Sequence, residues 1–150
     1  MPRRKGISPV IATVIIVAVT IAVAIAVAFW MTGIVGLFTA AEKLEITYAY
    51  ASPTSEGWTV TLKVNNTGTT PTSIDMVIIN GVQAGSSECS GATLNTQLPL
   101  TLNPGKGGKI EINIKKDNTC GTTTFTNGVS IEVKLHSTGG KEYPKLLVLP

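Results

Sequence analysis

The sequence predicts an α+β protein, in which a long N-terminal hydrophobic helix is followed by an antiparallel β-sandwich head. The first observation behind this prediction is a run without any charged residue from Gly6 to Ala41. The second is a series of period-two patterns after Ala41, with turn signals spaced by about 8 to 12 residues. The third is size, because the 109 residues from 42 to 150 are enough for one sandwich-sized core.

The uncharged run predicts a helix over residues 7–43 that is long enough to span a membrane. A bilayer core about 30 Å thick needs roughly 20 apolar residues in a helix, and this run is longer. A lone strand in lipid would leave its backbone groups unpaired, which favours the helix. Ser8 and Pro9 are typical of an N-cap and a first helical position. We expect the helix to continue for about a turn beyond Ala41.

The distribution of charges predicts the orientation of this helix in the membrane and argues against a nucleic-acid partner. The net charge of +3 comes from Arg3, Arg4 and Lys5, because the segment 42–150 carries nine lysines and nine acidic residues. A basic cluster before an apolar helix stays cytoplasmic, which puts the head outside the cell. The helix contains no charged residue of the kind that marks an ion path, so it is an anchor or a packing element. The head has no basic stripe, so we expect no nucleic-acid partner.

The head, residues 44–150, shows about seven to nine candidate strands. Leu44–Ala51 and Trp58–Val64 alternate, with a turn expected over residues 52–57. Asn80 and Gly81 are typical of a type I′ hairpin turn. Further strands are expected at 74–79, 82–89, 94–102, 109–115, 129–135 and 143–149. We interpret Trp58, Tyr48 and Tyr50 as a core cluster.

The stretch from Arg4 to Thr13, RKGISPVIAT in one-letter code, resembles the class III signal peptide and helix start of archaeal type IV pilins. In that family a prepilin peptidase cuts after the glycine, so the apolar helix stays in the mature subunit. The resemblance implies that residues 1–6 are removed and that the peptidase reads Lys5, Gly6, Ile7 and Ser8. Bacterial type IV pilins carry a glutamate where this chain has Ile11, so the resemblance is to the archaeal form.

The same resemblance implies how the subunit assembles. Mature helices of identical subunits would pack as the core of an extracellular surface filament, a homopolymer. A pilus assembly ATPase and a membrane platform would build it from a precursor held in the membrane with its N-terminus in the cytoplasm. Residues 64–68 and 102–105 resemble turns of CARDB-like immunoglobulin-type adhesion modules, which implies an immunoglobulin-like sandwich more than a function. We interpret the chain as the structural subunit of an archaeal type IV adhesive pilus, and Ser8 and Pro9 after the cut site favour a pilin. The alternatives are an archaellin, the subunit of a motility filament, and a monomeric membrane-anchored surface binding protein.

Few residues of the head are candidates for chemistry. Cys89 and Cys120 predict one disulfide in an exported domain, with two free loop thiols as the alternative. Asn65 begins an N-glycosylation sequon, with an ordinary turn asparagine as the alternative. His136, the single histidine, is interpreted as a solvated residue at a strand end. No spacing indicates a metal, a phosphate loop or a catalytic constellation, so we expect no cofactor and no enzymatic activity.

Overall fold

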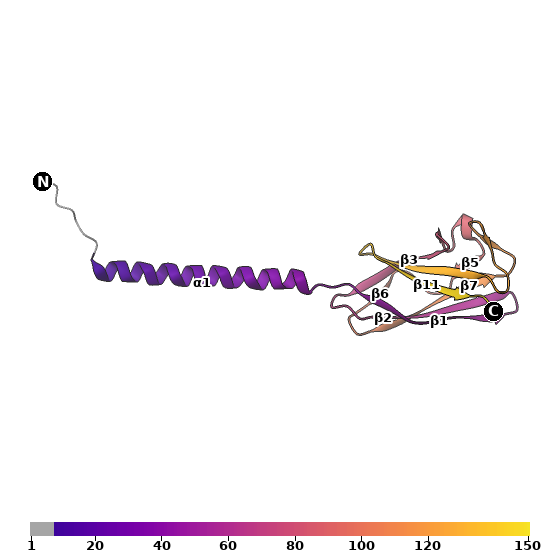
Figure 1. Ribbon diagram of the computed structural model, residues 1–150, viewed down its shortest axis with the longest axis horizontal. Coiled ribbons are helices and arrows are strands. Elements are labelled where there is room, and N and C mark those ends of the chain that lie inside the picture. The colour runs from indigo at the N-terminus through magenta and orange to yellow at the C-terminus, as the bar shows by residue number, and fades with distance from the viewer. Residues whose placement is uncertain (1–7) are drawn as a thin grey trace. The chain divides into compact units, whose positions relative to one another are not determined.

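The computed structural model describes residues 8–150. The chain divides into two compact units, with the division between Ala40 and Ala41. Figure 1 follows the chain in colour from the N-terminal helix into the strands of the head.

The first unit contains one helix, α1, which runs over Pro9–Thr39. Pro9 lies at the start of the helix, where its missing N–H removes no helical hydrogen bond. Ser8 occupies the N-cap position, and its carbonyl accepts a 3.1 Å hydrogen bond from the Ala12 N–H. Within the described residues its hydroxyl makes no capping bond. The sequence therefore predicted the start of the helix correctly, whereas the side-chain cap is not formed.

The helix ends earlier than predicted, because the backbone of residues 41–43 binds to a loop of the head. Ala40 is already extended, with ψ of 90°. The Lys43 carbonyl accepts hydrogen bonds from the N–H groups of Thr67 and Gly68. A side chain on Gly68 would collide with the backbone of Ala41 and Lys43, so this close approach requires glycine. The prediction of an extra helical turn is wrong, because the backbone carbonyls of Ala41 and Lys43 accept hydrogen bonds from the head.

The head contains eleven strands in the described chain. Their bounds, with that of one 3₁₀ turn, are β1 (Leu44–Thr54), β2 (Gly57–Asn66), β3 (Thr72–Ile79), β4 (Val82–Gln83), η1 (Ser87–Cys89), β5 (Ala92–Leu94), β6 (Leu100–Leu102), β7 (Gly107–Lys115), β8 (Thr119–Cys120), β9 (Thr123–Thr124), β10 (Ser130–Ser137) and β11 (Glu142–Val148).

Two antiparallel sheets enclose the core. Sheet A has the strand order β1-β2-β7-β5. Sheet B has the order β11-β10-β3-β4, with β6 also paired to β3, while β8 and β9 form a separate small pair. This arrangement confirms the predicted α+β class with an antiparallel sandwich head. The strands β1 and β11, which end sheets A and B, contact each other.

The core is built from the alternating apolar residues of the long strands. Fully buried members come from β2, β7, β3 and β10, and include Val60, Leu62, Val64, Ile110, Ile112, Ile74, Val77, Ile79, Ile131, Val133 and Leu135. The hairpin between β3 and β4 turns at Asn80 and Gly81, which have φ of 49° and 87°. Positive φ at both residues is what a type I′ turn requires, so this prediction is confirmed.

Strand β1 differs from its prediction in two ways. It pairs with β2 as far as Thr54 opposite Gly57, so Ser55 and Glu56 alone form the turn. Pro53 is tolerated in this strand because β1 lies at the edge of sheet A. The register also shifts between Ile46 and Tyr48. This bulge adds one residue, which moves every later side chain to the opposite face.

The bulge removes two tyrosines from the core. Beyond it, Ala49 and Ala51 pack against the core, while Tyr48 and Tyr50 lie exposed on the outer face of sheet A. Trp58 is buried as predicted, and its indole N–H donates a 2.8 Å hydrogen bond to the Pro150 carbonyl. The predicted core cluster of Trp58 with Tyr48 and Tyr50 is therefore wrong, because strict alternation does not continue through a bulge.

Candidate functional site

Over the described side chains, up to Ile34, the surface of α1 is apolar on all sides. The segment Pro9–Ile34, 26 residues long, has the length and composition to cross a membrane, and none of its most apolar window is buried inside the chain. The hydroxyls of Thr13, Thr20 and Thr32 donate to carbonyls three or four residues earlier in the helix. These threonines therefore bring no unpaired donor to the helix surface. Such a surface suits lipid or other apolar helices.

The predicted peptidase site lies almost entirely before the described residues. Lys5, Gly6 and Ile7 are outside the part of the chain that the structure describes, and Ser8 is its first residue. Ser8 stands directly before α1. The cut between Gly6 and Ile7 stays a prediction.

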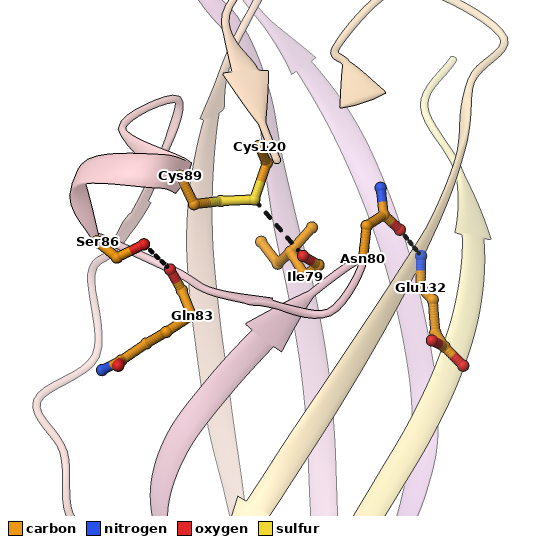
Figure 2. The surroundings of a disulfide bond; sticks show 7 residues. All are labelled: Ile79, Asn80, Gln83, Ser86, Cys89, Cys120 and Glu132. Carbon is orange, nitrogen blue, oxygen red and sulfur yellow. Dashed lines mark hydrogen bonds between the residues drawn. A yellow bond between two sulfur atoms is a disulfide. The ribbon is translucent and has the colours of Figure 1, made fainter. Parts of the chain in front are cut away.

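The two cysteines are joined by a disulfide bond, as the sequence predicted. Cys89 lies in η1 and Cys120 in β8, and both are fully buried. Figure 2 shows the Cys120 sulfur directed at the Ile79 carbonyl, 3.5 Å away. A bridged sulfur carries no hydrogen, so we treat this approach as a packing contact. The bond joins η1 to β8 and packs beside the end of β3. The sulfurs belong to the core although their sequence neighbours are polar.

The sequon asparagine lies in a strand and not in a loop. Asn65 is in β2, paired with Glu45 and Gly107, and is half-buried. The side-chain oxygen of Asn65 lies so close to Gly107 that a side chain there would collide with it. Glycosylation of Asn65 is not tested by this geometry and stays a prediction.

The neighbouring Asn66 has a structural role that sequence reasoning missed. It is fully buried, and its amide donates 2.8 Å hydrogen bonds to the carbonyls of Thr70 and Leu102. Its side-chain oxygen accepts from the Gly68 N–H at 2.9 Å. Asn66 thus holds together the loop that receives residues 41–43. The Asn-Thr-Gly sequence indicates a local turn, but the bond to Leu102 cannot be read from it.

The outer face of sheet A carries an aromatic pair surrounded by lysines. The rings of Tyr48 and Tyr50 stack with centroids 5.9 Å apart, and the Lys63 ammonium lies 5.8 Å from the centroid of the Tyr48 ring. On β7, Lys109 forms a 2.6 Å ion pair with Glu111. The Glu111 carboxylate raises the pKa of Lys109, by its hydrogen bond first and its charge second. We call this surface the tyrosine face.

The outer face of sheet B carries exposed aliphatic side chains. Leu146 and Val148 project from β11, and Leu146 is paired across the ladder with Glu132. The Lys134 ammonium lies 3.7 Å from a Glu132 oxygen and 3.5 Å from a Glu142 oxygen. We call this surface, made by the outward residues of β3, β10 and β11, the leucine face.

His136 also lies on the leucine face and is paired with a carboxylate. Its Nδ1 atom is 2.7 Å from an oxygen of Asp75. Among the described residues there is no group of three or more His, Cys, Asp or Glu side chains that could hold a metal ion.

A shallow cavity of about 290 Å³ near the β1–β2 turn is lined mainly by polar residues, among them Thr59, Thr93 and Asn113. The Thr59 hydroxyl donates a 3.0 Å hydrogen bond to the side-chain oxygen of Asn113 there. These two side chains therefore satisfy each other's hydrogen bonding.

Tyr143 joins β11 to the segment before β1. Its hydroxyl donates a 3.4 Å hydrogen bond to the Glu42 carboxylate. Burial raises the pKa of Tyr143, and the nearby charge of Glu42 raises it further, whereas a backbone hydrogen bond at Leu44 lowers it. The Lys141 ammonium donates to the Glu42 carbonyl at 2.8 Å.

No protein-family model matches the sequence, and no curated protein matches it either. Several solved structures are similar. The archaellum periplasmic stator protein FlaG from Sulfolobus acidocaldarius is 21% identical, with a TM-score of 0.47, over 71% of this chain and 100% of that chain. The archaeal flagellum of Methanospirillum hungatei is 18% identical, with a TM-score of 0.49, over 93% of this chain and 88% of that chain.

A third similar structure comes from a protein of a different kind. The apo PCuAC domain from PmoF1 is 14% identical, with a TM-score of 0.49, over 73% of this chain and 98% of that chain. All three scores lie below 0.5.

Proposed function

We propose that this chain is the structural subunit of an archaeal type IV adhesive pilus. It polymerises through its N-terminal helix and displays the β-sandwich on the filament surface. The observation that carries the proposal is α1, a 31-residue helix that is apolar on every side and whose most apolar window has no buried residue within its own chain. Such a helix requires an apolar environment that the chain itself does not supply.

The length of α1 fits two successive environments. At 1.5 Å per residue the helix is about 46 Å long, whereas the hydrocarbon core of a bilayer is about 30 Å thick. Before assembly, lipid covers the apolar surface. After assembly, neighbouring copies of the helix cover it, and the alanines interleaved between Ile21 and Ala28 permit close approach of helices. The change from lipid to bundle desolvates no charged side chain.

Removal of the basic cluster before the helix controls when the subunit can leave the membrane. Arg3, Arg4 and Lys5 hold the precursor with its N-terminus at the cytoplasmic side. A prepilin peptidase that cuts between Gly6 and Ile7 removes all three charges and leaves a neutral subunit. An assembly ATPase and a membrane platform then move the helix from lipid into the growing filament.

The properties of the head agree with an exposed position outside the cell. It has its own core and a buried disulfide, which suits an oxidising environment. Asn65 is proposed as a glycan acceptor. The role is structural and adhesive, and it involves neither a catalytic step nor a cofactor.

The proposal is tested by electron microscopy of surface filaments together with mass spectrometry of their subunits. We expect filaments whose protein begins at Ile7 and contains the rest of this chain. Filaments that rotate the cell would reassign the chain to the archaellins, which use the same kind of helix. A chain that keeps Met1 and purifies as a detergent-soluble monomer would instead identify a membrane-anchored surface binding protein.

A further inference from the structure

We infer that the tyrosine face and the leucine face of the head are two halves of one contact, in which the tyrosine face of one copy docks on the leucine face of the next. The inference rests on the proposed filament and names the part of the head that would hold neighbouring subunits together. It commits to a second copy of this chain as the partner of both faces.

Each face exposes large apolar side chains that the core does not need. Tyr48 and Tyr50 are 43% and 50% exposed, and Leu146 and Val148 are 71% and 56% exposed. On each strand the two residues alternate with inward-facing ones, so they form compact patches and are not scattered. Clustered exposed apolar side chains, rimmed by charges, are typical of an interaction surface. Tyrosine is enriched in the centre of such surfaces.

The charges of the two faces have opposite sign. The outward residues of sheet A carry three lysines against two glutamates, namely Lys63, Lys109, Lys115, Glu45 and Glu111. The leucine face carries three carboxylates against one lysine, namely Asp75, Glu132, Glu142 and Lys134. Docking of unlike faces therefore brings opposite charges together, whereas docking of like faces opposes equal charges.

Because the two faces lie on opposite sides of the head, the contact can repeat from one subunit to the next. They belong to the outer sides of the two sheets of one sandwich, so they point away from each other. A contact between two different patches on opposite sides of a subunit repeats from copy to copy and does not close into a two-fold dimer. This is the type of contact that an open-ended polymer needs.

The sheet edges are less suited to join the heads. Both β1 and β11 end their sheets. Each contains a proline, Pro53 or Pro144, and β1 also has the bulge between Ile46 and Tyr48. Prolines and bulges in edge strands interrupt edge-to-edge pairing. The exposed faces are therefore better suited to supply the contact than the β1 and β11 edges.

The contact is tested by cross-linking in filaments of the full chain. Tyr50→Cys and Leu146→Cys are placed in the same chain, and isolated filaments are treated with a short bis-maleimide. Cys89 and Cys120 are bridged and buried, so they do not react. We expect a ladder of dimers, trimers and larger species in denaturing electrophoresis. A chain with only one of the two substitutions should run as a monomer. Filaments that contain both single variants, mixed, should give dimers and no larger species.

A matched control uses two exposed positions outside both faces. Gln97→Cys with Thr122→Cys should leave the chain monomeric after the same treatment. Dimers from Tyr50→Cys alone would indicate a two-fold contact and overturn the inference. Filaments that contain the double variant but give no ladder would also overturn it, while the proposed function would stand. Absence of the chain from all filaments would overturn both.

Discussion

In α1, Ile15 exposes 52% of its surface and Phe29 75%, whereas Leu62 and Ile110 in the head are fully buried. Both regions are rich in aliphatic residues. Among the described side chains, those of the head core are buried within the chain, whereas the most apolar window of α1 has none buried. The stability of the head is therefore a property of one molecule. The apolar surface of the helix requires an apolar environment that its own chain does not supply, whereas the buried residues of the head determine how the head folds.

The largest expected effect is on core packing in the head. Leu62→Ala should lower the free energy of unfolding by about 2 to 5 kcal/mol, because it removes buried methyl groups and leaves a cavity. The midpoint of thermal unfolding, followed by β-sheet circular dichroism in detergent, should fall by roughly 10 °C or more. The matched variant Ile15→Ala in α1 should leave this midpoint unchanged. If Leu62→Ala and Ile15→Ala lowered the thermal midpoint equally, the difference in burial between the head and α1 would not determine the stability of the head.

Removal of the disulfide should have the next largest effect. The cysteines are separated by 31 residues, and closing a loop of that size stabilises a fold by about 3 to 4 kcal/mol. Cys89→Ala with Cys120→Ala should lower the denaturant midpoint accordingly, since the sulfurs also fill space in the core. The reducing agent dithiothreitol should lower the midpoint of the natural chain but not that of the double variant. An unchanged midpoint in the double variant would show that the bond adds no stability.

A charge in the helix should affect location without affecting the head. Ile21→Lys places an ammonium near the middle of the apolar segment, where insertion costs about 2.5 to 3.5 kcal/mol. We expect loss of membrane insertion in cell fractionation, and loss of the subunit from filaments. Ile21→Leu is the matched control and should insert normally. Normal insertion of Ile21→Lys would mean that α1 is not surrounded by lipid.

The smallest expected effect concerns Tyr143. Its folded-state pKa is raised, so its contribution to stability is complete below the unfolded pKa of about 10 and is lost as pH rises through the folded value. Lysines titrate in the same range, so the measurement is the difference between the natural chain and Tyr143→Phe. The gap between their unfolding midpoints should narrow from pH 9 to pH 11. A constant gap would show that Tyr143 does not titrate in this way.

Much of the architecture could be predicted because it depends on local patterns. The uncharged run predicted α1, and period-two alternation predicted β2, β7 and β10. The Asn80 and Gly81 turn was predicted from its backbone requirement. The Cys89–Cys120 disulfide could be named because the chain has only two cysteines.

The candidate surfaces were harder to predict, because they depend on register and on contacts between distant residues. Alternation placed Tyr48 and Tyr50 in the core, and the bulge at Ile46 to Tyr48 moved them to the outer face. The leucine face includes Leu146 and Val148 from a run of four apolar residues, which does not itself show which side faces out. Only pairing with β10 separates exposed Leu146 from buried Leu147.

The sequence by itself determined that a chargeless helix precedes an antiparallel head, since hydrophobicity and residue period act along the chain. Tertiary structure decided where the helix stops, which tyrosines are exposed and what Asn66 binds. The end of α1 at Thr39 depends on hydrogen bonds from residues 67–69 to the backbone of residues 41–43. Those bonds join segments more than 20 residues apart, and their formation depends on the folded head and not on local preference.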